Sequence, residues 1–126
     1  MVEFGLLCMA RVLIAEDEAF TALALVDLLT EQGHTVQDAP DGAIAIDMLR
    51  SFEADVLITD LMMPNMSGDD LIRQLRAQPG RQIAVILISG VPEGRLPDDI
   101  PYDSYLSKPI DHVALGHLVK RLAPNA

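Results

Sequence analysis

The amino-acid sequence predicts an α/β fold, doubly wound, in which helices cover both faces of a five-stranded parallel sheet. Apolar runs alternate along the chain with helix-period segments, which is typical of βα units whose strands are buried on both faces. Four of these runs lead into reactive side chains, namely Glu16 with Asp17, Asp60, Ser89 and Lys108. Because the carboxyl ends of parallel strands share one edge of a sheet, we expect these side chains to meet there.

The element boundaries follow from apolar periodicity and from helix stop signals. Strands are predicted at residues 11–16, 34–38, 55–59, 83–88 and 103–106. Helices are predicted at 19–32, 41–52, 68–77 and from 112 to the residues before 124. Gly33 and Pro79 are suited to end the first and third helices, and Asp111 is suited to cap the start of the last.

The segment from Ser89 to Lys108 interrupts this alternation. It reads SGVPEGRLPDDIPYDSYLSK, with prolines at positions 92, 97 and 101. A proline inside a helix removes a backbone donor and clashes with the preceding turn, at a cost of about 3 kcal/mol. A regular βα repeat would have its fourth helix here, between the strands at 83–88 and 103–106. We expect this helix to be degraded or missing, with one turn at most in an extended loop.

The charge balance argues against nucleic acids and membranes as direct partners. Nine basic residues against nineteen acidic residues give a formal charge of −10, which repels a phosphate backbone and an anionic lipid surface. No apolar run approaches the roughly 20 residues needed to cross a bilayer. We expect no direct nucleic-acid binding and no membrane insertion.

The length of 126 residues fits one domain of ordinary size. Since the first predicted strand starts at Arg11, Met9 is a sensible start, so we interpret residues 1–8 as an N-terminal extension and residues 9–126 as the domain. The single Cys8 excludes an internal disulfide, and the first ten residues lack the features of a secretory signal. These features predict a cytoplasmic protein.

The three carboxylates expected at the sheet edge require either protons or a cation. Like charges about 4 Å apart repel by roughly 4 kcal/mol at an effective dielectric constant of about 20. Mg2+ prefers oxygen ligands and commonly combines carboxylates with phosphate oxygens. Asp60, followed by the loop LMMPNMSG, is the best candidate for a nucleophile toward phosphorus, and the Lys108 ammonium would neutralise a phosphoryl oxygen.

The combination of EDE, TDLMMPNMSG, ISG and YLSKP resembles the receiver domain of two-component response regulators, over residues 11–122. The resemblance implies a flavodoxin-like fold with the strand order 2-1-3-4-5. It also implies that Asp60 is the phosphoacceptor and that Glu16 and Asp17 are the acidic pair that binds Mg2+ or Mn2+. The backbone carbonyl of Met62 matches the third protein ligand of the metal.

The same resemblance assigns roles at the other strand ends. Ser89 matches the switch hydroxyl that bonds the phosphoryl group, and Lys108 matches the lysine of the family. Tyr105 matches the aromatic side chain that changes rotamer near the signalling surface. The resemblance also implies a cis peptide bond between Lys108 and Pro109.

The predicted function is that of a stand-alone, chemotaxis-type receiver. It would accept a phosphoryl group onto Asp60 from a histidine kinase or a histidine phosphotransfer protein, or from a small donor, and would catalyse its own dephosphorylation. It would then act on an unknown downstream protein, pass the group onward or drain it from a kinase. Alternatives are a pseudo-receiver that only binds proteins, and a Mg-dependent phosphohydrolase. Such hydrolases usually have a second acid two residues after the nucleophile, where this chain has Met62.

The sequence leaves the roles of several features open. The degraded fourth helix puts the usual receiver dimer in doubt and makes its loop a candidate two-state element. The second apolar face of the 19–32 helix is either a docking patch for a helical hairpin or a surface covered by the N-terminal extension. The methionines of the 61–67 loop provide either partner contacts or loop packing. The three histidines lack metal-ligand spacing, and we assign them no role.

Overall fold

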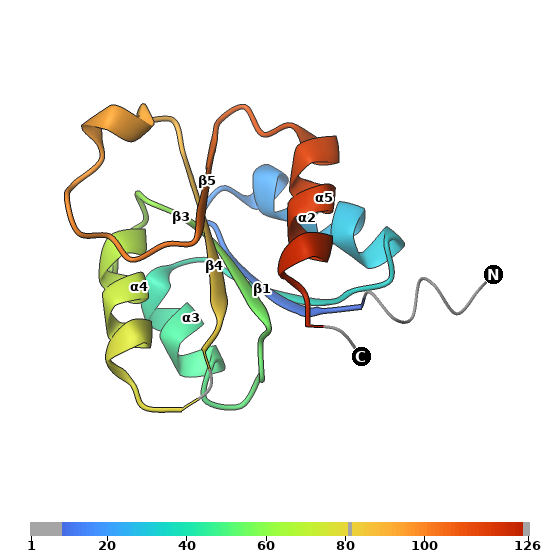
Figure 1. Ribbon diagram of the computed structural model, residues 1–126, viewed down its shortest axis with the longest axis horizontal. Coiled ribbons are helices and arrows are strands. Elements are labelled where there is room, and N and C mark those ends of the chain that lie inside the picture. Colours follow the sequence, from blue (N-terminus) through green and yellow to red (C-terminus); the bar gives the residue numbers. More distant parts are fainter. Residues whose placement is uncertain (1–8, 81, 125–126) are drawn as a thin grey trace.

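A five-stranded parallel sheet lies between two helical layers in the computed structural model, which describes residues 9–80 and 82–124 (Figure 1). The strands are β1 (Arg11–Ala15), β2 (Thr35–Ala39), β3 (Val56–Asp60), β4 (Ala84–Ser89) and β5 (Ser104–Ser107). The helices are α2 (Ala19–Glu31), α3 (Gly42–Met48), α4 (Gly68–Ala77) and α5 (His112–Leu122). The strand order β2-β1-β3-β4-β5 confirms the predicted topology. The N-terminal extension lies outside the described residues.

Alternation along the strands divides the core between the two faces of the sheet. Leu13, Leu57 and Leu87 pack with the buried side chains of α3 and α4. These two helices lie on the left of the sheet in Figure 1. Ile14 and Ile58 belong to the opposite cluster, together with the buried side chains of α2 and α5. Successive side chains of a strand point to opposite faces, so continuous apolar runs are needed where helices cover both.

The helix boundaries agree with the predictions except at the end of α3. Gly33 adopts a φ of 96° after α2, and Asp111 accepts hydrogen bonds from two backbone N–H groups at the start of α5. The predicted helix at 41–52 is too long, because α3 ends at Met48 and the next residues form turns. These turns bring Phe52 into the core, which a continued helix pattern does not reveal.

The predicted loss of the fourth helix is confirmed. Between β4 and β5 the chain forms one 3-10 turn, η1 (Glu93–Arg95), and is otherwise a loop that folds back beside α4 (Figure 1). Ile100 is buried in the core, and the Tyr102 hydroxyl donates to Glu93 at 2.7 Å. Apart from η1, the loop of residues 90–103 therefore has a defined path without helical hydrogen bonding.

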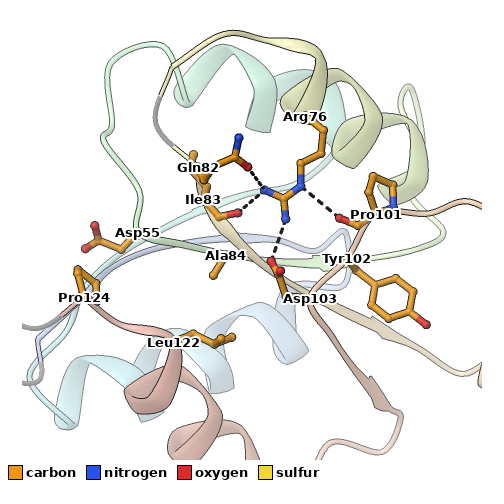
Figure 2. Close-up of a pocket in the computed structure, with 10 residues that line it drawn as sticks. All are labelled: Asp55, Arg76, Gln82, Ile83, Ala84, Pro101, Tyr102, Asp103, Leu122 and Pro124. Atoms are coloured by element: carbon orange, nitrogen blue, oxygen red, sulfur yellow. Dashed lines mark hydrogen bonds and ion pairs between the residues drawn. The ribbon is translucent and has the colours of Figure 1, made fainter.

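Arg76 of α4 fixes the returning end of this loop (Figure 2). Its guanidinium donates to the backbone carbonyls of Pro101 at 3.2 Å and Ile83 at 2.6 Å. It also pairs with Asp103 at 2.8 Å, and the same Asp103 oxygen accepts from the Val85 N–H at 2.7 Å. One side chain thus joins α4, the start of β4 and the residues that lead into β5.

Replacing Arg76 by Met should lower the free energy of unfolding by about 2 kcal/mol, because carbonyl and carboxylate acceptors lose a charged donor. Urea denaturation measures this change. Arg73→Met is the matched control on the same helix, because the Arg73 side chain is 40% exposed against 20% for Arg76. Its pairs with Asp69 and Asp70 should contribute less than about 1 kcal/mol. Equal losses in the two variants would contradict a special role for Arg76.

His34 is a buried titratable group at the opposite end of the sheet from the strand ends that carry the acids. Its Nδ1 accepts from the Ala10 N–H at 2.9 Å, and its Nε2 is buried without a hydrogen-bond partner in the described part of the chain. Burial, with a smaller effect of the Lys120 charge, lowers the pKa of His34. Folding therefore favours the neutral form of this imidazole.

Unfolded His34 takes up a proton more readily than folded His34, so this residue should lower the free energy of unfolding as the pH drops below about 6.5. Above that pH the imidazole is neutral in both states, and it contributes no pH dependence. His34→Asn keeps an acceptor for the Ala10 N–H and removes the titration. Chemical denaturation at about pH 7.5 and about pH 5.5, on either side of the ordinary histidine pKa, should show the wild type losing stability relative to the variant as the pH falls. Parallel profiles would show that another group is responsible.

Among the described residues, no helix has the length and apolar character required to cross a membrane.

Candidate functional site

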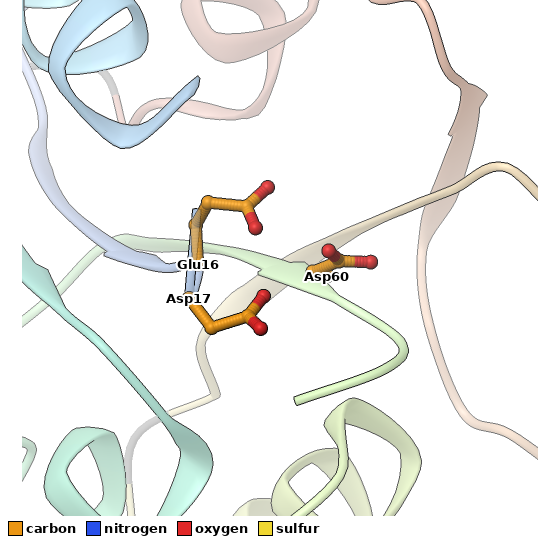
Figure 3. A group of neighbouring side chains, drawn as sticks. All are labelled: Glu16, Asp17 and Asp60. Atoms are coloured by element: carbon orange, nitrogen blue, oxygen red, sulfur yellow. The ribbon is translucent and has the colours of Figure 1, made fainter. Parts of the chain in front are cut away.

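Three carboxylates converge at the carboxyl edge of the sheet. Asp60 is the last residue of β3, and Glu16 and Asp17 directly follow β1, which is paired with β3. One carboxylate oxygen from each residue lies within 4.8 Å of the others. Figure 3 shows the side chains leaving the ends of these adjacent strands toward a common region. The convergence predicted from the apolar runs is confirmed.

The cluster has a buried side and an exposed side. Glu16 and Asp60 are buried, whereas Asp17 is exposed. Burial, with a contribution from the charge of Asp60, raises the pKa of Glu16 to about 7. The Glu18 N–H, which donates to Glu16 at 3.1 Å, and the Lys108 ammonium oppose this shift. A proton or a bound cation would therefore offset the cost of burying the Glu16 carboxylate.

Lys108 places an ammonium in contact with this cluster. Its Nζ lies 2.7 Å from Asp60 Oδ2 and 3.1 Å from Glu16 Oε1. Burial disfavours the charged amine, but the hydrogen bond to Asp60 and the nearby negative charge of Glu16 outweigh it, and the pKa of Lys108 is raised. The Lys108 N–H donates to the Ser89 carbonyl at 2.8 Å, and the Lys108–Pro109 peptide is cis. The structure therefore places Lys108 where the sequence predicted it.

Ser89 and Tyr105 meet at the start of the 90–103 loop. Ser89 is the buried last residue of β4, and its Oγ accepts from the Val91 N–H at 2.9 Å. The Tyr105 hydroxyl donates to the Ser89 carbonyl at 3.2 Å and also to the Val91 carbonyl. In this conformation both side chains hold the loop backbone. Their switching roles stay predictions.

The family described as "Response regulator receiver domain" matches residues 12–120. The chain belongs to this family. Sensor kinase CckA of Brucella abortus is 32% identical over 118 residues, which cover 90% of this chain and 12% of the kinase. PhoP of Pseudomonas aeruginosa, a two-component response regulator, is 35% identical and is matched over 79% of this chain and 45% of its own length.

A solved structure gives the same assignment. The receiver domain of a signal transduction histidine kinase from Syntrophus aciditrophicus is 34% identical, with a TM-score of 0.82, and the match covers 90% of this chain and 89% of that one. The receiver domain described here is thus a phosphoacceptor signalling module, of the kind that histidine kinases phosphorylate. The chain spans less than half the length of the two relatives named above.

The side chains of the receiver domain fit a hard divalent cation. The buried Glu16 Oε1 accepts no hydrogen bond within the described residues, although it lies near the Lys108 ammonium. Oxygen donors from several carboxylates, with room for water, suit Mg2+. Met62 lies beside Asp17 in a groove of about 420 Å3, so the loop that follows Asp60 borders the cluster.

The glycine that follows this loop has a role that the sequence analysis missed. Gly68 starts α4, and its N–H donates to the Leu61 carbonyl at 2.7 Å. A Cβ on Gly68 would lie 2.0 Å from the Asp60 carbonyl oxygen, so only glycine lets the helix start contact the backbone of the acceptor residue. The sequence contained a signal for this contact. Glycine is more usual after a helix than at its first position, so Gly68 at the start of a predicted helix indicates a close backbone approach.

Gly68→Ala should lower the free energy of unfolding by about 2–4 kcal/mol, because backbone atoms of Asp60 or α4 must shift. Gly116→Ala is the matched control within α5, where the added methyl group would meet the Gln32 side chain at 2.7 Å. That side chain is flexible, and alanine favours the helix, so the change should stay within about 1 kcal/mol. Urea denaturation of both variants decides, and a mild effect at Gly68 would contradict the close backbone contact.

Proposed function

We propose that Asp60 accepts a phosphoryl group from a phosphohistidine of a histidine kinase or a histidine phosphotransfer protein. Mg2+ or Mn2+ would be held by Glu16, Asp17 and Asp60, with the Met62 backbone carbonyl as a further ligand. The observation that supports this proposal best is the placement of three carboxylate oxygens within 4.8 Å of one another, with the Lys108 ammonium 2.7 Å from Asp60.

In the proposed transfer, a carboxylate oxygen of Asp60 forms a bond to phosphorus while the bond between phosphorus and the donor imidazole nitrogen breaks. The electron pair of that bond leaves with the imidazole. The Lys108 ammonium can pair with a phosphoryl oxygen without leaving the site, since it already lies between Asp60 and Glu16. A bound divalent cation would neutralise charge on the phosphoryl oxygens, which is the main requirement of phosphoryl transfer.

The donor protein would dock on the exposed side of α2. Ala22, Leu25 and Leu29 face the core, whereas Phe20 is 84% exposed and Leu23 is also exposed. Phe20 borders a groove of about 330 Å3 that reaches Lys108, Pro109 and Ile110. An apolar patch beside the acceptor site suits the apolar contacts of a helical hairpin. The alternative cover, the N-terminal extension, lies outside the described residues.

Ser89 and Tyr105 would couple phosphorylation to the 90–103 loop. The Ser89 Oγ is an acceptor in its bond with the Val91 N–H, so its own proton is free to be donated to a phosphoryl oxygen. Turning the hydroxyl toward Asp60 would release the Val91 N–H. The backbone at Ser89 and Val91, to which the Tyr105 hydroxyl also donates, would then be held less firmly. The loop would then change conformation at its outgoing end while Arg76 keeps the returning end in place.

The physiological setting that we propose is a stand-alone cytoplasmic receiver with residues 1–8 as an extension. It would signal by contact with a protein target, by onward transfer or as a phosphate sink. A pseudo-receiver would lack a working acceptor, but the acids and the lysine required for one are together in this structure. A phosphohydrolase is disfavoured because Met62, at the position of the second acid, has no proton to donate.

Incubation with Mg2+ and acetyl phosphate should add one phosphoryl group to the wild-type protein and none to Asp60→Asn, as measured by intact mass. Mg2+ alone should raise the melting temperature of the wild-type protein, since a ligand that binds only the folded state stabilises it. Asp17→Asn should lose most of this shift. Asp69→Asn, which changes an acid of α4 outside the cluster, is the matched control and should keep both responses.

The same experiment separates the alternatives. Absence of an Asp60-dependent mass gain and of beryllofluoride binding would indicate a pseudo-receiver. Rapid multiple turnover of a small phosphoester would indicate a hydrolase instead.

A further inference from the structure

We infer that Asp41 is a positioning residue for the metal site, although it belongs to none of the strand ends that carry the acids. It precedes α3 and contacts the 61–67 loop, which connects Asp60 to α4 and contains Met62. The inference rests on the proposed function, in which this loop presents a backbone carbonyl to Mg2+.

The far half of the loop has a backbone conformation that must be held from outside. Asn65 adopts a φ of 68°, and the Met66 N–H donates to the Pro64 carbonyl at 2.7 Å. A three-residue turn around a positive φ is rare and strained for a residue other than glycine. Such conformations persist where surrounding contacts impose them, and they are concentrated at functional sites.

Asp41 provides the contacts that hold this turn. Its Oδ2 accepts from the Asn65 side-chain amide at 2.8 Å, and its Oδ1 accepts from the Ile44 N–H at 2.8 Å, which caps α3. The Ile44 N–H and the Asn65 amide lower the pKa of Asp41, so that it stays a carboxylate at neutral pH. Asp41 is buried, and its two hydrogen bonds connect the start of α3 to the turn.

The backbone beside Asp41 adds a second connection. The Gly42 N–H donates to the Met66 carbonyl at 3.2 Å, and a Cβ on Gly42 would lie 2.5 Å from that oxygen. The near end of the loop is held by the bond from the Gly68 N–H to the Leu61 carbonyl at 2.7 Å. The Met62 side chain is 69% exposed and contributes little packing, so the two anchored ends determine where its backbone lies.

Two variants test whether the contact between Asp41 and Asn65 serves the metal site. Asn65→Gly removes the amide and lets the backbone keep a positive φ without strain, so the fold should be as stable as the wild type or more so. Asp41→Ser keeps a side chain suited to cap α3 but is too short to reach Asn65. Asp111→Ser is the matched control, because Asp111 caps α5 in the same way without contacting the loop.

Calorimetric titration with Mg2+ and with Mn2+ should show affinity reduced by roughly tenfold in Asn65→Gly and Asp41→Ser, as for other residues that orient metal ligands. The control should bind like the wild type. Amide hydrogen exchange in metal-free protein should be faster at Met66 and Gly42 in both variants, with the global stability of Asn65→Gly preserved. Exchange in the absence of metal reports on the loop independently of phosphorylation.

Unchanged metal affinity in Asn65→Gly and Asp41→Ser, with normal binding by the wild type, would overturn the positioning role and leave the proposed function intact. Failure of the wild-type protein to bind either cation would overturn the metal site itself, and the positioning role with it. An equal loss of affinity in Asp111→Ser would also count against the inference, because it would show that any weakened cap has the same effect.

Discussion

Repulsion among carboxylates at the edge of the parallel sheet is the constraint on which the site depends. The pairing of β1 with β3 brings Glu16 and Asp17 beside Asp60, and two of the three acids are buried. Lys108, from the segment after β5, offsets part of this charge through contacts at 2.7 Å and 3.1 Å. The remaining negative charge favours a divalent cation and a transferable phosphoryl group over any apolar ligand.

The surrounding backbone keeps these acids close in spite of their repulsion. Gly68 lets α4 contact the Asp60 carbonyl, and the turn around Asn65 holds the loop in between. Both features are locally unfavourable for the backbone but keep the loop close to the acids, as is common at functional sites. The sheet provides the stability that such a loop lacks, since helices pack against both of its faces.

The 90–103 loop distinguishes this receiver domain from a regular βα repeat. Its prolines remove the helix, and specific side chains replace helical hydrogen bonds as the source of order. Ser89 and Tyr105 hold the outgoing end beside the acceptor site, whereas Arg76 holds the returning end at the opposite edge of the sheet. A loop with one end held at the acceptor site and the other held by α4 is suited to change shape locally without loss of the fold.

The resemblance to receiver domains implied the strand order, whereas the sequence by itself determined the acidic cluster, Lys108 and the missing helix. These follow from apolar periodicity, from proline geometry and from the rule that parallel strands end at one edge, all of which are local patterns or properties of a whole architecture. Tertiary structure alone decided the end of α3, the raised pKa of Glu16 and the contacts of Asp41 and Arg76. Each of these depends on distances between side chains remote in the sequence, and neither propensity nor spacing encodes such distances.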